Sequence, residues 1–587
     1  MMRSSKDHYA PNAMALDATG ISPIEQMALY ERMLLPRLIE EKSLKLLRQG
    51  KISKWFSGIG QEAVSVGLTH ALDRSDVILP LHRNLGVFTT REMPLEKLFA
   101  QWQGKAEGFT HGRDRSFHFG SLEHRVVGMI SHLGAMLGVA DGFALDSLLR
   151  DAGEVAAVFS GDGGTSEGDF HEAVNVAAVW DLPVLFVVEN NGYGLSTPSG
   201  EQYRCARFAD KAIGYGIEGI RIDGNDVFEV YRTVQRLADS LRERPRPVLL
   251  EAMTFRMRGH EEASGTKYVP DELFSLWRER DPVERLERHL LETGIIDQSV
   301  AAGTRHAMNE RIQSAWDAVF ALAPVEASIE RECADVYAVR QDPAVRRGNG
   351  ATQSLRFVDA VSAALDTAMA SDDRLVLMGQ DIAEYGGVFK VTDGFVERYG
   401  RDRVRNTPLC ESAVLGCALG LSLAGRPSVV EMQFADFVSC GFNQIVNNLA
   451  KTHYRWGAPV QVTVRLPTGA GSSAGPFHSQ SNEAWFTHVP GLKVVYPSTA
   501  EDAKGLLLAS IRDPNPVMFF EHKGLYRSVQ GDVPDADYEI ALGRARIAQP
   551  GDRLTIVTYG AGVKWALAEA ERHGGVEVID LRSLLPW

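Results

Sequence analysis

Cysteine is scarce in this sequence of 587 residues, and long apolar runs are absent. The five cysteines form no CxxC pair, which argues against a disulfide framework or a zinc knuckle and favours a reducing compartment. Without a run of about 18 apolar residues, no membrane-spanning helix is expected. Residues 1–21 lack both the apolar stretch of a signal peptide and the arginine richness of a transit peptide. We therefore expect a disordered lead-in and a cytoplasmic protein.

Basic residues are outnumbered by acidic ones, 62 against 76, which gives a formal net charge of −14 with neutral histidines. An acidic surface argues against non-specific nucleic-acid binding, because that activity needs a basic face. Hydrophobic residues make up 44% and charged residues 24%, a balance that excludes disorder over most of the chain. The length indicates about three to four domains.

Short apolar segments alternate with amphipathic ones along the chain. Segments 154–164 and 183–194 are typical of buried strands that end in glycine, and the segment between them is typical of a helix. Such βαβ units form parallel sheets, so the expected fold class is α/β, with parallel sheets flanked by helices. The segment 336–352 loses this periodicity and is rich in Pro, Gly, Asn and Arg, which predicts a linker.

These patterns divide the chain into five segments. In order, we expect a lead-in over 1–21, a first α/β domain over 22–335, the linker over 336–352, a second α/β domain over 353–541 and the start of a third over 542–587. The last segment contains a single βαβ unit, which is too small to cover both faces of its own sheet. The expectation is therefore a truncated third domain.

Oxygen-bearing residues follow two consecutive predicted strands. Asp162 comes directly after the first strand, and Asn191 and Tyr193 follow the second. Because the carboxyl ends of neighbouring parallel strands meet at one sheet edge, we expect these residues to lie together. One carboxylate, one amide oxygen and one backbone carbonyl suit Mg²⁺ that also binds phosphate oxygens. The adjacent glycines allow close approach of a diphosphate; they are Gly161, Gly163 and Gly164.

Two other interpretations of this segment stay open. A nicotinamide-binding fingerprint would place an acidic residue about 20 positions further on, where Asp181 lies, but the GxGxxG spacing is missing. An uncompensated carboxylate at Asp162 would also repel a bare diphosphate, which a metal ion would prevent. The plainest alternative is a glycine turn after a capped strand.

The stretch GDGGTSEGDFHEAVNVAAVWDLPVLFVVENNGYGLST resembles the thiamine diphosphate motif of the 2-oxo acid dehydrogenases, the decarboxylating first components of multienzyme complexes. Residues from about 22 to 330 resemble the alpha subunit of this family, and residues from about 353 to 587 resemble the beta subunit. The two subunits are therefore expected to be fused in one chain. The motifs HRNLGVFTTREMPLE, NTPLCE, EMQFADF and FFEHKGLYR resemble those of the branched-chain type.

This resemblance implies a thiamine diphosphate-binding fold, followed by part of a C-terminal domain like that of transketolase. The implied cofactors are thiamine diphosphate and Mg²⁺, with Asp162, Asn191 and the carbonyl of Tyr193 as metal ligands. The implied cofactor-binding residues are His82, Arg83, Met129, Gly161, Asp162, Gly163, Gly164, Asn191, Tyr193, Glu411 and Phe437. The family usually has tyrosine where this chain has His82, and Met129 is equally well explained as a core residue.

The catalytic residues implied by the resemblance are Glu411, His260 and His478. A carboxylate at Glu411 would favour the imino form of the aminopyrimidine ring, which then takes the proton from the thiazolium carbon. Phe437 would stack on that ring, or simply pack in the core. The two histidines lie in Gly/Ser-rich loops after predicted strands, where they could hold the substrate carboxylate and pass a proton. Glu261 replaces the regulatory serine of animal members, so control by phosphorylation there is not expected.

The activity implied is oxidative decarboxylation of a branched-chain 2-oxo acid such as 2-oxoisovalerate, with transfer of the acyl group to the lipoyl group of a partner acyltransferase. The implied assembly is a homodimer, because family members are α₂β₂. Pyruvate or acetoin is the alternative substrate, since one methylene in an apolar pocket decides only about 1–3 kcal/mol. An NAD-dependent dehydrogenase and a non-catalytic assembly subunit are more remote alternatives.

Overall fold

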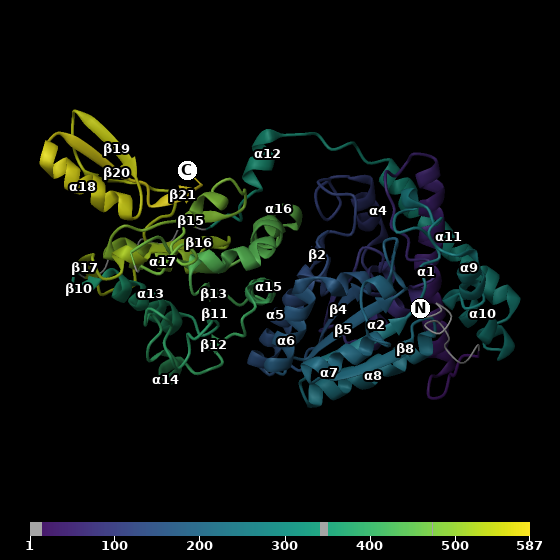
Figure 1. Cartoon of the computed structure of the whole chain (residues 1–587). Helices are drawn as coiled ribbons and strands as arrows, with labels where there is room; N and C mark the ends of the chain where they lie inside the picture. Colours follow the sequence, from purple (N-terminus) through teal and green to yellow (C-terminus); the bar gives the residue numbers. More distant parts are fainter. Residues whose placement is uncertain (1–14, 341–349, 472, 587) are drawn as a thin grey trace. The chain divides into compact units, whose positions relative to one another are not determined.

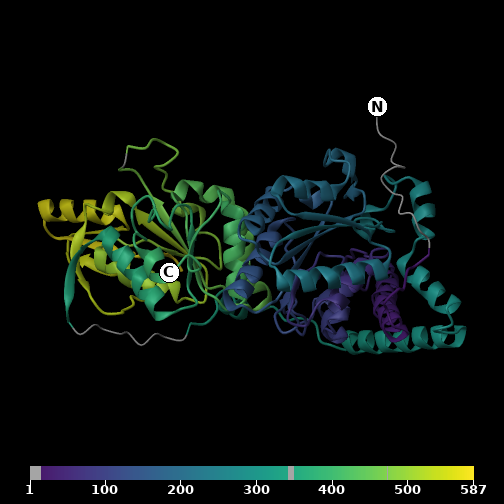
Figure 2. The same cartoon turned by 90° about the horizontal axis from the view of Figure 1, so that it is seen from below.

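The computed structural model describes residues 15–340, 350–471 and 473–586. The expected lead-in over 1–21 and linker over 336–352 therefore fall partly outside the described residues. The chain divides into two compact units, Met1–Ala327 and Ser328–Trp587, here called unit 1 and unit 2. In each unit a mainly parallel sheet is flanked by helices, which confirms the predicted α/β fold class (Figures 1 and 2).

Unit 1 is built on a seven-stranded sheet with the order β2-β3-β1-β4-β5-β9-β8. All neighbouring strands are parallel except the short pair β2–β3. The strands are β1 (Val77–Leu79), β2 (Gly120–Ser121), β3 (Val126–Val127), β4 (Ala156–Gly161), β5 (Val184–Asn190), β8 (Glu218–Asp223) and β9 (Val248–Met253). Strands β4, β5 and β9 are almost wholly buried, as their continuous apolar sequences require in a sheet covered on both faces.

The helices of unit 1 begin where their sequences provide caps. Ser22 accepts a hydrogen bond from the Glu25 amide at the start of α1, and Asp226 caps α8 in the same way. The helices are α1 (Pro23–Arg48), α2 (Glu62–Ala71), α3 (Leu85–Thr90), α4 (Leu95–Gln103), α5 (Ala135–Arg150), α6 (Gly168–Val179), α7 (Ala212–Tyr215), α8 (Val227–Glu243), α9 (Asp271–Arg278), α10 (Pro282–Glu292) and α11 (Gln298–Phe320). The predicted β4-α6-β5 unit is confirmed.

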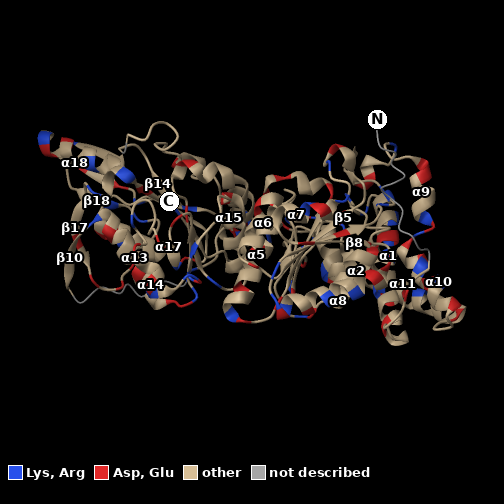
Figure 3. Cartoon of the chain, turned by 60° about the horizontal axis from the view of Figure 1, so that its bottom comes forward, with Lys and Arg blue, Asp and Glu red and all other residues tan. Residues whose placement is uncertain are grey.

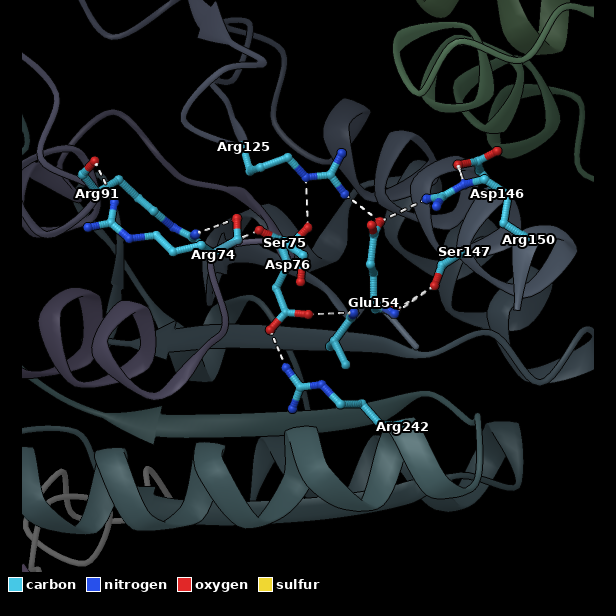
Figure 4. A network of polar contacts seen from close by, with 11 residues as sticks. Arg74, Ser75, Asp76, Arg91, Arg125, Asp146, Ser147, Arg150, Glu154 and Arg242 are labelled. Carbon is cyan, nitrogen blue, oxygen red and sulfur yellow. Dashed lines mark hydrogen bonds and ion pairs between the residues drawn. The ribbon is translucent and has the colours of Figure 1, made fainter. Parts of the chain in front are cut away.

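A polar network closes the amino-terminal edge of this sheet (Figure 4). Asp76, directly before β1, is fully buried, accepts a hydrogen bond from the Val155 amide at 2.8 Å and pairs with Arg242 of α8. Glu154, before β4, pairs with Arg125, which lies before β3. The network fixes the starts of three strands at the edge opposite to their carboxyl ends.

Unit 2 contains a second seven-stranded sheet with the order β12-β11-β13-β14-β16-β15-β21, parallel except for the last pair. Its strands are β11 (Val376–Gly379), β12 (Val404–Asn406), β13 (Ser428–Glu431), β14 (Val462–Thr468), β15 (Lys493–Val495), β16 (Val517–His522) and β21 (Ser583–Leu585). Helices α13 (Phe357–Ser371) and α17 (Ala500–Ile511) pack together in one core with apolar residues of β11, β13 and β16. Helix α15 (Glu411–Leu423) packs against β13 and β14.

The smaller elements of unit 2 complete it. They are α12 (Ile329–Ala334), β10 (Thr352–Arg356), α14 (Phe395–Tyr399), α16 (Ala450–Trp456), β17 (Gln530–Pro534), β18 (Arg546–Gln549), β19 (Leu554–Thr558), α18 (Ala561–His573) and β20 (Val576–Asp580). The predicted β19-α18-β20 unit is present with parallel strands, and β18 adds an antiparallel strand that was not predicted. Strand β21 then joins the seven-stranded sheet beside β15.

Acidic and basic side chains are interspersed within each unit (Figure 3). Across the three described ranges, no helix combines the length and the apolar character needed to cross a membrane.

Candidate functional site

A cavity of about 270 Å³ lies at the carboxyl edge of the unit 1 sheet. It is lined by loops that follow β1, β4, β5 and β9, so one sheet edge brings together segments that are distant in sequence. Nine predicted site residues line it: His82, Arg83, Gly161, Asp162, Gly163, Gly164, Asn191, Tyr193 and His260.

The oxygens predicted to bind a metal lie in this cavity. Strands β4 and β5 are in parallel register with Gly161 opposite Glu189, so Asp162 and Asn191 leave the sheet at the same edge. Asp162 is buried, and its Oδ2 has no hydrogen-bond partner among the described residues. Burial raises the pKa of Asp162 to about 7. An orphaned buried carboxylate oxygen is what a site for a cation requires, so these residues fit Mg²⁺.

Two of the glycines have a steric role here. A Cβ at Gly163 would lie 2.7 Å from the Cα of Gly194, and one at Gly164 would lie 2.9 Å from Ser160 Oγ. A Cβ at Gly161 would meet nothing within 4 Å. The glycine turn after β4 therefore lets the backbone approach the Tyr193 segment closely, which forms a cradle suited to a diphosphate.

Arg83 is the cation that the loop after β1 supplies. Its guanidinium donates to the Ser57 carbonyl at 2.9 Å, and it lies 2.8 Å from His82 Nε2 and 3.3 Å from His260 Nδ1. Burial, with a contribution from the charge of Arg256, lowers the pKa of Arg83 to about 10, so it stays cationic near neutral pH. A buried, oriented guanidinium is well suited to phosphate oxygens.

The two histidines beside Arg83 are neutral near neutral pH. Burial, together with the charge of Arg83, lowers the pKa of His260 to about 4 and holds that of His82 well below its usual value. His82 Nδ1 lies 3.3 Å from the sulfur of Met129. Met129 is buried and is not among the residues that line the cavity.

Sequence reasoning missed two charged residues of this cavity, Glu189 and Arg256. Arg256 donates to the Leu195 carbonyl at 3.0 Å and to the Tyr268 hydroxyl at 2.9 Å. It lies three positions after the end of β9, so its place after a strand was a usable signal. Glu189 lies inside a buried strand, where nothing in the sequence shows which face its side chain takes.

A second group of predicted residues lies at the carboxyl edge of the unit 2 sheet. Glu411 is the first residue of α15, and Gln380, directly after β11, donates to its Oε1 at 3.1 Å. His478, in the loop after β14, packs edge-on against Phe437, with ring centroids 5.5 Å apart. It makes a closer edge contact of 4.8 Å with Phe434. Unit 2 therefore provides a carboxylate at a helix start and, at the same sheet edge, an aromatic cluster with a histidine.

No group of three or more His, Cys, Asp or Glu side chains placed to hold a metal occurs in residues 15–340, 350–471 and 473–586. The cation site predicted in unit 1 would use one carboxylate, one amide and one backbone carbonyl, a set that contains only one such side chain.

Comparison with known proteins assigns both units. Residues 30–324 match the family model described as the dehydrogenase E1 component, and residues 353–529 match the transketolase pyrimidine-binding domain. These families use thiamine diphosphate, so the chain is a thiamine diphosphate-dependent enzyme. More particularly, it belongs to the dehydrogenase E1 component family, and it is a 2-oxo acid dehydrogenase with alpha-like and beta-like regions in one chain.

Several curated relatives are beta subunits of such enzymes. The chain is 46% identical over 242 residues to 2-oxoisovalerate dehydrogenase subunit beta 2 of Arabidopsis thaliana, covering 40% of this chain and 67% of that protein. It is 45% identical over 240 residues to the 2-oxoisovalerate dehydrogenase subunit beta of Bacillus subtilis, covering 40% of this chain and 73% of that protein. It is 41% identical over 238 residues to the pyruvate dehydrogenase E1 component subunit beta of Staphylococcus epidermidis, covering 40% and 73%.

Proposed function

We propose that the chain catalyses oxidative decarboxylation of a branched-chain 2-oxo acid such as 2-oxoisovalerate, and transfers the acyl group to the lipoyl group of a partner acyltransferase. The names of the Arabidopsis thaliana and Bacillus subtilis relatives support this substrate, and the Staphylococcus epidermidis relative keeps pyruvate as a second candidate. The single observation that carries the proposal is the gathering of nine predicted residues around one cavity of unit 1. A cytoplasmic homodimer is the form that we propose.

We assign different roles to the residues at the carboxyl edges of the two sheets. In unit 1, Asp162, Asn191 and the Tyr193 carbonyl hold Mg²⁺, and Arg83 binds the diphosphate with the glycine cradle. When bound, thiamine diphosphate supplies a thiazolium carbon acid and an electron sink for decarboxylation.

In unit 2, the carboxylate of Glu411, to which Gln380 donates a hydrogen bond, would bind a ring nitrogen of the pyrimidine, and Phe437 would provide an aromatic face for that ring. For His260 of unit 1 and His478 of unit 2, the proposed roles are to hold the substrate carboxylate and then to pass a proton to the lipoyl sulfur. Neutral His260, beside the fixed charge of Arg83, donates a hydrogen bond to an anionic substrate without adding further charge.

Parallel decarboxylation assays with the two candidate substrates test this proposal. The full chain, with thiamine diphosphate, Mg²⁺ and an artificial electron acceptor, is given 2-oxoisovalerate or pyruvate, and carbon dioxide release is measured for each. We expect kcat/KM to favour 2-oxoisovalerate by about tenfold or more, the discrimination that one or two apolar carbons provide. A preference for pyruvate would refute the proposed substrate, but it would still agree with a 2-oxo acid dehydrogenase.

A further inference from the structure

Glu189 has a buried carboxyl group that the proposed chemistry leaves unused. It is the penultimate residue of β5, it lines the unit 1 cavity, and its side chain is about 1% exposed. Its two carboxylate oxygens have different surroundings. Oε1 accepts a hydrogen bond from Asn84 Nδ2 at 2.9 Å, whereas Oε2 makes no hydrogen bond to any residue that the structure describes. A buried carboxylate oxygen without a donor is costly, so its retention needs an explanation.

Asn84 fixes the direction of this carboxylate. The Oδ1 of Asn84 accepts a hydrogen bond from the Leu81 amide at 2.7 Å, so its Nδ2 has to face Glu189. The contact joins β5 to the loop after β1, which carries Arg83. Glu189 is thereby held with one oxygen anchored to the protein and the other left to face whatever occupies the cavity.

The charges in the cavity limit what that occupant can be. Arg83 and Arg256 are cationic, and Asp162 is the other acidic residue of the lining. A bare diphosphate beside Glu189 would be repelled, because two like charges at short range destabilise each other. A donor that accompanies the diphosphate would instead be attracted, and the water molecules that Mg²⁺ retains when it binds proteins are such donors.

The position of Glu189 along β5 suits contact through water. Gly161 is its register partner on β4, so Glu189 lies behind Asp162 on one strand and behind Asn191 on the other. The two residues from Glu189 to Asn191 span roughly 6–7 Å along an extended chain. Glu189 therefore lies near the proposed metal ligands, two residues before Asn191, without being adjacent to either of them in the chain.

We propose that Glu189 is a further residue of the cofactor site, whose Oε2 accepts a hydrogen bond from a water molecule bound to the divalent cation. The inference rests on the proposed function, because it assumes the magnesium site of Asp162 and Asn191. Outer-shell partners of this kind orient the inner ligands and strengthen metal binding. Glu189 also connects the cation to the Arg83 loop through Asn84.

Cofactor binding without substrate tests this role. Glu189→Gln keeps an oxygen for Asn84 but places an amide nitrogen where the accepting Oε2 was, so it can no longer accept there. Tryptophan fluorescence of the full chain is titrated with Mg²⁺ at saturating thiamine diphosphate, and then with thiamine diphosphate at saturating Mg²⁺. We expect the half-saturating Mg²⁺ concentration to rise about 10–100-fold, with less than about a threefold change in cofactor affinity at saturating Mg²⁺.

Glu218→Gln is the matched control, because Glu218 is an exposed residue of β8 in the same sheet and lies outside the cavity. Unchanged Mg²⁺ dependence in Glu189→Gln would overturn the inference, as would a loss of cofactor affinity that Mg²⁺ does not restore. If Glu189→Gln lowers the unfolding temperature of the cofactor-free chain, Glu189→Asp is tested in its place. The same rise in the half-saturating Mg²⁺ concentration is expected for that variant. Failure of the wild-type chain to bind Mg²⁺ with thiamine diphosphate would instead contradict the proposed function.

Discussion

At the scale of single residues, the site depends on groups whose charge is set by burial. Arg83 stays cationic while the two histidines that touch it stay neutral, because burial first, and then the charge of Arg83, lowers the pKa of both histidines. This arrangement concentrates positive charge on one oriented group. It also separates the role proposed for His260, donation of a hydrogen bond, from the role proposed for Arg83, attraction of an anion.

The lowered pKa of His260 predicts a pH dependence of stability. The unfolded chain binds this proton near pH 6.5 and the folded chain only near pH 4, so acid favours unfolding between these values. Stability is therefore fully present above about pH 6.5 and falls as the pH drops towards 4. In the cofactor-free chain, His260→Gln should flatten part of this decline in unfolding temperature. An equally steep decline in the variant would contradict the assignment.

Glu411 is the residue on which the proposed catalysis most depends. Glu411→Gln keeps the shape of the side chain and a hydrogen-bond partner for Gln380, but it removes the carboxylate. We expect carbon dioxide release to fall about 10²–10⁴-fold, the usual contribution of an acid–base residue, with thiamine diphosphate still bound. Glu397→Gln, a change on the surface of α14, serves as the control. Undiminished turnover in Glu411→Gln would rule out its role.

At the scale of elements, turns after parallel strands place the functional groups in both units. The turn between β4 and α6 leaves no room for a side chain at Gly163, because this residue lies against the backbone of Gly194. Gly163→Ala should push the Asp162 loop away from the Tyr193 segment and weaken binding of thiamine diphosphate with Mg²⁺ at least tenfold. Gly168→Ala is the matched control, since a Cβ there meets nothing within 4 Å. Calorimetric titration of both variants compares the effects, and equal affinities would refute the steric argument.

The polar network at the amino-terminal edge of the unit 1 sheet is predicted to stabilise the fold. Asp76 and Asp73 both pair with Arg242, but Asp76 is buried and Asp73 is 68% exposed. Asp76→Asn removes the buried carboxylate that accepts from Arg242 and should lower the local stability of β1 and β4 by about 1–3 kcal/mol. Asp73→Asn should cost about 1 kcal/mol or less. Hydrogen exchange of strand amides measures both effects, and similar values for the two variants would argue against this role.

Much of this element structure was predictable from the sequence, because local patterns determine it. The β4-α6-β5 unit and the placement of Asp162 and Asn191 after strands follow from apolar runs and glycines. The antiparallel partner β18 was not predictable, since long-range pairing leaves no local pattern. Glu189 was missed for a related reason: which face of a buried strand a side chain takes depends on its neighbours.

At the scale of the whole molecule, the chain combines two α/β units that carry different chemistry on equivalent sheet edges. Unit 1 supplies the oxygens proposed as metal ligands, a glycine cradle and a buried guanidinium. Unit 2 supplies a carboxylate at a helix start and an aromatic cluster beside His478. Membership of the dehydrogenase E1 component family agrees with this pairing of functions in one chain.

The most direct test of this account is release of carbon dioxide from carboxyl-labelled 2-oxoisovalerate by the full chain, measured with and without thiamine diphosphate and Mg²⁺. The account predicts release that requires both cofactors and is lost in Asp162→Ala and, independently, in Glu411→Ala, because each unit contributes an indispensable part. Release that does not need the cofactors, or that survives either substitution, would contradict the central claim.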